Sequence, residues 1–514
     1  MSTQTTNNNK RIAKNTLLLY FRMLFMMVVS LYTSRVILNA LGVEDFGIYN
    51  VVGGVVAMFT VISGSLSAAI SRFITYELGK GDQSKLNRIF SASVTIQLLL
   101  SLIIVVLIES VGVWFLNAKM TIPEDRMTAA NWVLQFSIIT FVINLISVPY
   151  NAAIIAHEKM SAFAYISILE ALCKLAIAFL IMCSPIDKLI YYAVLMCIVA
   201  VIVRLTYGHY CKKHFSECTY HFLWDKELLS KMFSFAGWQF FGTGSYMLMT
   251  QGVNILLNFF FGPVVNAARG IAVQVDGIIQ QFVNNFTTAI NPQITKSYAG
   301  DNKAYMFLLI YTGAKYSYFL VLFFAIPIIL ETNTILTLWL KNVPEHTVSF
   351  LRLIICIDLL YVLSNTMMTA MISTGNIKKY QIIVGGTGML VFPISWLCFY
   401  FGLPPEVAFI IQFLIFIIQL VYRLFLLHEM IGLPIVGFCQ QVLLKALTVT
   451  IVAFIPPPLL VHNIISANEI LRFITVGTIS VCVTIITIYC VGLSTKEKNI
   501  VKSKIKQQFN KHDD

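Results

Sequence analysis

Apolar stretches of about 20 residues follow one another along almost the whole chain, separated by short polar segments. An α-helix of that length crosses the hydrocarbon core of a bilayer and satisfies its own backbone hydrogen bonds there. The pattern therefore predicts an all-α polytopic membrane protein with about fourteen transmembrane helices. We place them near residues 15–40, 46–71, 89–114, 128–149, 161–183, 189–208, 233–260, 264–291, 305–330, 349–373, 379–401, 406–428, 436–460 and 469–493.

A degraded repeat relates the first half of the chain to the second. Leu38-Asn39 followed by Gly42 returns as Leu257-Asn258 followed by Gly262, and Gly81-Asp82 returns as Gly300-Asp301. A chance match of short apolar runs is the alternative, but the shared Gly-Asp pair keeps the same distance from the shared Leu-Asn pair in both halves. Repeated halves in a membrane chain are typical of transporters built from two lobes around a central site.

Lysine and arginine are distributed unevenly among the polar segments. With the N-terminus in the cytoplasm, about 24 of them lie in cytoplasmic segments and about four in exoplasmic ones, as the positive-inside rule requires. Both termini are then cytoplasmic, and the first and seventh helices run in the same direction, so we predict two six-helix lobes related by a parallel pseudo-two-fold repeat. The predicted parts are an N-terminal lobe (1–208), a cytoplasmic linker (209–232), a C-terminal lobe (233–430), two appended C-terminal helices (431–494) and a basic cytoplasmic tail (495–514).

Composition and charge exclude several classes of protein. Hydrophobic residues make up 58% of the chain and charged residues 12%, with a mean hydropathy of +0.80, whereas about a quarter of the residues of a soluble domain are charged. The net charge of +12 arises mainly from the cytoplasmic segments, so we expect contact with anionic membrane lipids and not with nucleic acid. The sequence has no GxxxxGK[ST] loop and no exoplasmic loop long enough for a catalytic domain, so we expect neither an ATP-driven pump nor an enzyme.

One short segment is rich in histidine and cysteine. His209, Cys211, His214, Cys218 and His221 have side chains that suit zinc, but their spacing fits no common zinc site. We interpret the segment as a solvated cytoplasmic loop and predict neither a metal site nor a cofactor.

The eighth predicted helix carries the most distinctive polar pattern. At 100° per residue, its polar side chains fall on a stripe about 80° wide. Such a face cannot point at lipid, because unpaired polar groups there cost several kcal/mol each. We interpret it as the wall of a hydrated cavity, and the alternative is a buried polar seam between helices. The stripe consists of Arg269, Asp276, Gln280, Asn284, Thr287 and Asn291.

Ionisable residues occur in other predicted helices as well, where they usually mark substrate or ion pathways. Glu170 and Lys174 are one turn apart and close enough to pair. Asp358 lies within the tenth helix, Arg35 towards the outer end of the first, and Arg72 at the inner end of the second. Cations outnumber anions among these groups, which favours an anionic ligand, and guanidinium groups suit phosphate especially well. The carboxylates are candidates for binding a coupling proton or Na⁺.

Four short runs resemble a known family. They are TSRVILNALG at 33–42, EDFGIYN at 44–50, NAARG at 266–270 and NPQI at 291–294. Together they resemble bacterial polysaccharide (O-antigen) flippases of the Bacteroidetes type, which belong to the superfamily that also contains multidrug and toxin extrusion transporters.

The resemblance implies a function and a location. Family members carry an undecaprenyl-pyrophosphate-linked oligosaccharide from the inner to the outer leaflet of the bacterial inner membrane, by alternating access and with proposed ion coupling. Polysaccharide polymerase and assembly proteins are the partners it suggests. In that picture, the substrate-binding candidates are Arg269, Lys174, Arg35, Arg72, Gln280 and Asn284, and the candidates for ion coupling or pairing are Asp276, Glu170 and Asp358.

Two other functions remain as alternatives. A cation-coupled drug or metabolite antiporter of the same fold would carry several acidic residues in its N-terminal lobe, where Glu170 is the obvious one. A membrane glycosyltransferase, polymerase or ligase would need a sizeable exoplasmic loop with catalytic residues, and this chain has none.

Overall fold

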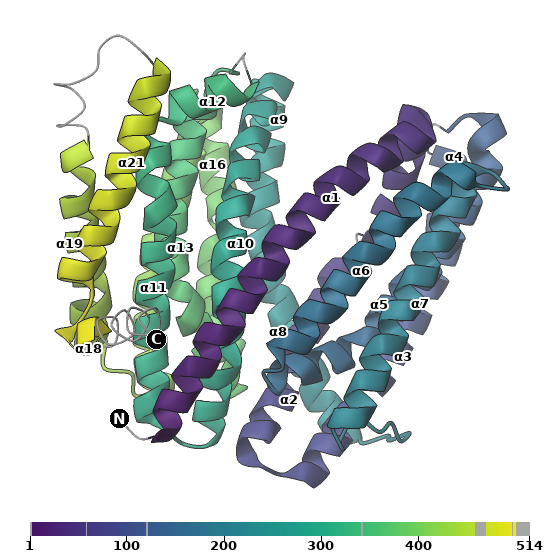
Figure 1. Cartoon of the computed structure of the whole chain (residues 1–514), viewed down its shortest axis with the longest axis horizontal. Coiled ribbons are helices and arrows are strands. Elements are labelled where there is room, and N and C mark those ends of the chain that lie inside the picture. The colour runs from purple at the N-terminus through teal and green to yellow at the C-terminus, as the bar shows by residue number, and fades with distance from the viewer. Residues whose placement is uncertain are drawn as a thin grey trace, which may run out of the picture. The chain divides into compact units, whose positions relative to one another are not determined.

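The computed structural model describes residues 3–57, 59–119, 122–340, 343–457, 469–495 and 497–499. Within this part of the chain the structure is helical throughout, with short turns and no strand (Figure 1). Eleven helices of the described residues are long and apolar enough to cross a membrane. The predicted all-α membrane fold is therefore confirmed.

Three of the fourteen predicted windows are not among those eleven helices: 46–71, 233–260 and 264–291. The first is divided between two helices that end at Ala57 and begin at Thr60. The other two contain the most polar stretches, and their polar side chains lower the hydropathy of long helices. Polarity, and not a lack of helix, thus distinguishes these two windows from the rest.

The described helices fall into two compact units. The N-terminal unit comprises Met1–Thr243, Thr288–Asn302 and Gly375–Ile377, and the C-terminal unit comprises Gly244–Thr287, Lys303–Thr374 and Lys378–Asp514. The domain boundaries predicted from the sequence stay a prediction. In chain order the helices are α1 (Thr3–Ala57), α2 (Thr60–Lys80), α3 (Gln83–Leu107), α4 (Val113–Lys119), α5 (Met127–Ala156), α6 (Met160–Leu180), α7 (Lys188–His214), α8 (Lys226–Met247), α9 (Val253–Phe261), α10 (Pro263–Ala299), α11 (Lys303–Leu330), α12 (Thr332–Leu340), α13 (Thr347–Thr374), α14 (Lys378–Tyr380), α15 (Gly386–Met389), α16 (Val391–Tyr400), α17 (Val407–Ile431), α18 (Ile435–Phe438), α19 (Leu444–Phe454) and α21 (Glu469–Thr487).

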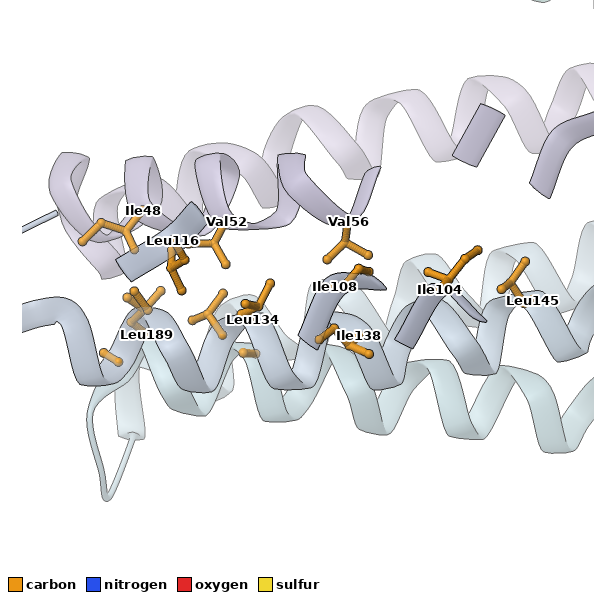
Figure 2. Close-up of a cluster of buried hydrophobic side chains, with 14 residues drawn as sticks. Ile48, Val52, Val56, Ile104, Ile108, Leu116, Leu134, Ile138, Leu145 and Leu189 are labelled. Carbon is orange, nitrogen blue, oxygen red and sulfur yellow. The ribbon is translucent and has the colours of Figure 1, made fainter. Parts of the chain in front are cut away.

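A hydrophobic cluster forms the core of the N-terminal unit. Ile48, Val52 and Val56 of α1 meet Leu134 and Ile138 of α5, and residues of α3, α4 and α7 complete the cluster (Figure 2). Around this core, α5 packs along α7, and α1 packs along α6. Lipid is as apolar as these side chains, so close van der Waals packing, and not removal from water, stabilises such contacts in a membrane.

In the C-terminal unit, α11 is the central helix. It packs against α13 on one side and against α19 and α21 on the other (Figure 1). The helix α13 also packs against α17. The helices that correspond to the last two predicted windows, α18–α19 and α21, therefore belong to this packed unit.

The sequence repeat has a counterpart in the backbone. Gly42 has φ 83° and ψ 166°, and Gly262 has φ 82° and ψ −176°. This region of the backbone map is open almost only to glycine. Gly42 interrupts α1, and Gly262 separates α9 from α10. Two equivalent positions of the repeat thus share one rare conformation, which argues against a chance match.

The Gly-Asp pairs of the repeat lie in equivalent turns. Gly81 ends α2 in the left-handed conformation, and the Asp82 carboxylate begins α3 by accepting a hydrogen bond from the Lys85 backbone at 3.1 Å. A glycine after one helix and an aspartate before the next are favourable cap residues. Gly300 and Asp301 occupy the turn between α10 and α11.

The solvated loop expected at the histidine and cysteine segment is only partly correct. His209, His214 and His221 are exposed, but Cys211 and Cys218 are buried. The Cys211 thiol points at the backbone carbonyl of Tyr150, 3.5 Å away. Cys211 thus anchors the end of α7 to α5, and His209, Cys211 and His214 belong to this helix and not to a loop.

Candidate functional site

Arg269 is the first polar residue of the stripe on α10, and it is buried in the C-terminal unit. Its side chain is 9% exposed, and its Nη2 donates to the backbone carbonyl of Thr250 at 2.9 Å. Thr250 lies in a π-helical turn, Leu248–Gly252, between α8 and α9. Turns of this kind often occur at functional positions of membrane and soluble helices. Within the described residues, the buried Nε of Arg269 has no hydrogen-bond partner.

Two carboxyl groups meet further along the same face. Asp276 of α10 and Asp358 of α13 lie in direct contact, and Gln280 Nε2 donates to Asp358 Oδ1 at 2.8 Å. Asp358 is 5% exposed. Asp276 is also electrostatically attracted to Arg269. The structure thus brings together four of the residues selected from the sequence: Arg269, Asp276, Gln280 and Asp358. We call them the acid–base group.

This arrangement can bind a small cation. Two ionised carboxylates in contact repel each other strongly when buried, and a proton or Na⁺ between them removes the repulsion. Tyr246 and Tyr361 border the acid–base group, with their rings 6.1 Å apart. Asn284 lies one turn beyond Gln280 on α10, and its side chain is exposed.

A second set of ionisable residues lies in the N-terminal unit. Lys174 Nζ donates to Glu170 Oε1 at 2.6 Å, which confirms the predicted pair on α6. The side chains are 33% and 38% exposed for Glu170 and Lys174. Arg22 of α1 lies over the Phe163 ring at 4.4 Å and is attracted to Glu170. Two cations therefore share one carboxylate here.

Arg72 belongs to neither set. The Arg72 guanidinium lies over the rings of Phe73 and Tyr76, at 4.8 and 4.5 Å. It also touches the backbone at Gly375, where an added Cβ would be 2.6 Å from Nη2. Arg72 is thus held in a packed aromatic environment. Arg35 is part of α1, and its side chain lies outside the described residues.

Glu158, at the turn between α5 and α6, was not selected from the sequence. Its side chain is fully buried, and its carboxylate accepts from Arg11 Nε at 2.8 Å, Lys296 Nζ at 2.7 Å and Gln293 Nε2 at 2.6 Å. Its backbone is left-handed, with φ 58°. These partners come from α1 and the end of α10, far away in the sequence. The only local signal is a charged break, His157-Glu158-Lys159, between two apolar windows.

Arg423 of α17 was also missed. It is 4% exposed and donates to Ser364 Oγ at 3.3 Å and to Gln419 Oε1 at 3.4 Å. In the part of the chain that the structure describes, no carboxylate forms an ion pair with Arg423. An arginine inside the twelfth apolar window was the signal available.

Comparisons with known proteins agree with this architecture. The family model described as "Polysaccharide biosynthesis protein" matches residues 12–298. An uncharacterised membrane protein of Bacillus subtilis, EpsK, is 20% identical over 284 residues, which is 54% of this chain and 55% of that protein. The chain thus matches about half the length of this curated relative.

Solved structures share the fold. A multidrug and toxin extrusion (MATE) transporter in its bent conformation has a TM-score of 0.72, with 12% identity over 84% of this chain and 98% of that one. A transporter of the MOP superfamily from Pyrococcus furiosus, described as having a binding pocket of reverse polarity, has a TM-score of 0.68 and 12% identity over 85% of this chain and 99% of that one.

The matched family model covers more than half of the chain, and the fold is that of the solved MATE structures. The chain therefore belongs to the polysaccharide biosynthesis protein family, as a multi-pass membrane protein whose fold is shared with the MATE transporters.

Proposed function

We propose that this protein moves an undecaprenyl-pyrophosphate-linked oligosaccharide from the inner to the outer leaflet of the bacterial inner membrane, with both termini in the cytoplasm. The observation that carries the proposal is a buried arginine, Arg269, on the polar face of a membrane helix. Burial of a guanidinium is unfavourable unless it is paired or used. Membership of a polysaccharide biosynthesis family supports a glycan-bearing substrate.

The anionic part of such a substrate matches the free donors of Arg269. Guanidinium binds pyrophosphate through two parallel N–H···O bonds. Gln280 and the exposed Asn284 extend the same face with neutral donors. In the N-terminal unit, Lys174 is a further cation for the anionic head, and Arg35 and Arg72 complete the proposed set of substrate-binding residues.

The carboxyl pair supplies a route to ion coupling. A proton or Na⁺ bound between Asp276 and Asp358 changes the charge opposite Arg269, so cation binding and anion binding affect each other. Glu170 has a pairing role, because it already accepts from Lys174.

The test uses proteoliposomes that contain a fluorescent undecaprenyl-pyrophosphate oligosaccharide, with a quencher added outside. We expect the wild type to move label across the bilayer and Arg269→Ala to lose this activity. Lys231→Ala is the control, since it also removes one positive charge, but from an exposed side chain that is paired to Glu227. Equal activity of Arg269→Ala would exclude Arg269 from the substrate path, and a wild type without activity would contradict the flippase proposal.

A cation-coupled antiporter is the second candidate function. It is favoured by the two carboxylates that face one guanidinium in the acid–base group, because a cationic substrate needs that balance. In the same liposomes, efflux of a cationic dye driven by a proton or Na⁺ gradient, without movement of the lipid-linked glycan, would support it.

A further inference from the structure

The N-terminal unit contains a cavity of about 220 Å³ between α1, α5 and α7. Tyr49 and Gly53 of α1 border it on one side. Phe136, Ser137, Thr140 and Asn144 of α5 border it on the other. The cavity is separate from the ionisable residues described above, and its lining consists of neutral residues throughout.

The polar side chains of the cavity are available to a ligand. Ser137, Thr140 and Asn144 lie within about 60° on α5, so they form one narrow polar face. Within the described residues, nothing hydrogen-bonds to their side chains. Ser147, further along the same helix, instead donates to the Ile143 carbonyl at 2.8 Å. Asn144 is exposed in the middle of a membrane-spanning helix, and an exposed carboxamide there must face water and not hydrocarbon.

The aromatic side chains of the cavity are held in place by the core. Tyr49, Phe136 and Phe141 pack against the hydrophobic cluster, of which Val56 and Ala193 also border the cavity. Tyr49 is further held by the ring of Tyr192, with centroids 4.6 Å apart. The cavity therefore combines fixed ring faces with free hydroxyl and carboxamide groups.

Aromatic faces together with neutral polar groups favour binding of a sugar ring over binding of a charged group. Without a cation in its lining, the cavity offers nothing to compensate a phosphate or a carboxylate. Hydroxyl and amide groups match the donors and acceptors of sugar hydroxyls, and the negative face of an aromatic ring attracts the weakly positive C–H face of a pyranose. The volume equals about seven water molecules and is below the range of drug-sized pockets.

We propose that this cavity binds one neutral pyranose unit of the transported glycan. The proposal rests on the proposed function, and it assigns glycan recognition to the N-terminal unit and anion binding to Arg269 in the C-terminal unit.

Gly53→Leu tests the proposal, because an added Cβ at Gly53 meets nothing within 4 Å and a longer side chain can grow into the cavity. Gly47→Leu on the same helix is the matched control, since its Cβ is equally unobstructed and it does not line the cavity. Thr140→Val, which keeps the shape of the side chain and removes the hydroxyl, is the second variant. Each variant is taken as folded if it is recovered in detergent as a monodisperse peak.

The assay measures initial transport of two lipids in proteoliposomes over a range of concentrations. One is the lipid-linked glycan extracted from cells that produce this protein, and the other is undecaprenyl pyrophosphate without sugar. We expect Gly53→Leu to raise the half-saturating concentration of the glycan lipid at least tenfold and Thr140→Val about threefold to tenfold, each effect corresponding to lost sugar contacts. The half-saturating concentration of the sugar-free lipid should be unchanged in both cavity variants. The Gly47→Leu control should match the wild type for both lipids.

Three results would overturn the proposal. An unchanged half-saturating concentration for both cavity variants excludes the cavity as a sugar site while leaving the flippase function intact. An equal loss of transport for both lipids shows that the filled cavity blocks movement of the lipid and does not affect recognition of its sugar. A wild type that moves the sugar-free lipid or cationic dyes, but no lipid-linked glycan, overturns the proposed function together with the sugar site.

Discussion

The two units hold their ionisable residues in different ways. In the C-terminal unit, Arg269 and Asp358 are 9% and 5% exposed, and the carboxyl groups of Asp276 and Asp358 touch. In the N-terminal unit, Glu170 and Lys174 form a simple pair one turn apart, with about a third of each side chain exposed. The sequence alone presents both sets as charges inside membrane helices.

The two sets of charges differ in their effect on stability. A buried charge loses its hydration, and ion pairing often fails to restore that loss. An exposed i,i+4 pair contributes only about 0.3–0.5 kcal/mol. The acid–base group therefore carries a cost in stability that the exposed pair does not.

The largest expected effect is at Arg269. Arg269→Ala removes the charge-assisted hydrogen bonds to the proposed pyrophosphate and leaves Asp276 and Asp358 uncompensated, so we expect transport to fall at least about 100-fold and stability to fall by about 3 kcal/mol. Initial rates in proteoliposomes and thermal unfolding in detergent measure the two effects. Arg269→Lys, which keeps the charge without the fork, should recover part of the rate.

The next effect concerns ion dependence. Asp358→Asn keeps the shape of the side chain and its contact with Gln280, but it removes one of the two acids, so we expect transport to lose its response to a proton or Na⁺ gradient. The rate under a gradient should fall by about 10-fold to 100-fold, while the rate without a gradient changes little. Asp301→Asn, in the exposed turn between α10 and α11, is the control. A full response in Asp358→Asn would remove the carboxyl pair from the coupling mechanism.

Stability in acid should depend on Glu497 of the C-terminal unit. Burial raises the pKa of Glu497, but hydrogen bonds from Lys315, Tyr316 and the Ser494 backbone outweigh burial and lower this pKa to about 2. A carboxylate whose folded pKa is below its unfolded value stabilises the protein above the unfolded pKa, and this contribution disappears as pH falls through the folded pKa.

The lowered pKa of Glu497 corresponds to about 3 kcal/mol of stabilisation at neutral pH. Solvent screening reduces this value little, because the side chain is only 17% exposed. Glu497→Gln should therefore lower the melting temperature at pH 7, and the difference from wild type should shrink as pH falls from about 4.5 to 2. A constant gap between Glu497→Gln and wild type would place the contribution of Glu497 in packing and not in its charge.

The smallest effect is expected at the exposed pair. Lys174→Ala should change stability by less than about 0.5 kcal/mol and reduce transport less than about tenfold, because the Lys174 ammonium is already engaged by Glu170 and partly hydrated. Lys231→Ala should change neither quantity. A loss as large as that of Arg269→Ala would end the distinction between the two units.

Sequence patterns identified the elements and the local geometry. Helical periodicity placed Arg269, Asp276 and Gln280 on one face, and i,i+4 spacing gave the Glu170–Lys174 pair, since both depend only on neighbours within a helix. Glu158 was missed because its partners Arg11 and Lys296 are more than 130 residues away. The cavity at Ser137, Thr140 and Asn144 was missed because scattered neutral polar residues are ordinary in membrane helices.

Gly42 and Gly262 restrict the gene as well as the protein. Both backbones adopt a conformation that only glycine takes without strain, and glycine is encoded by the four codons that begin with two guanines. At these two codons, the first and second bases are therefore fixed by the shape of the chain, and only the third base is free to drift.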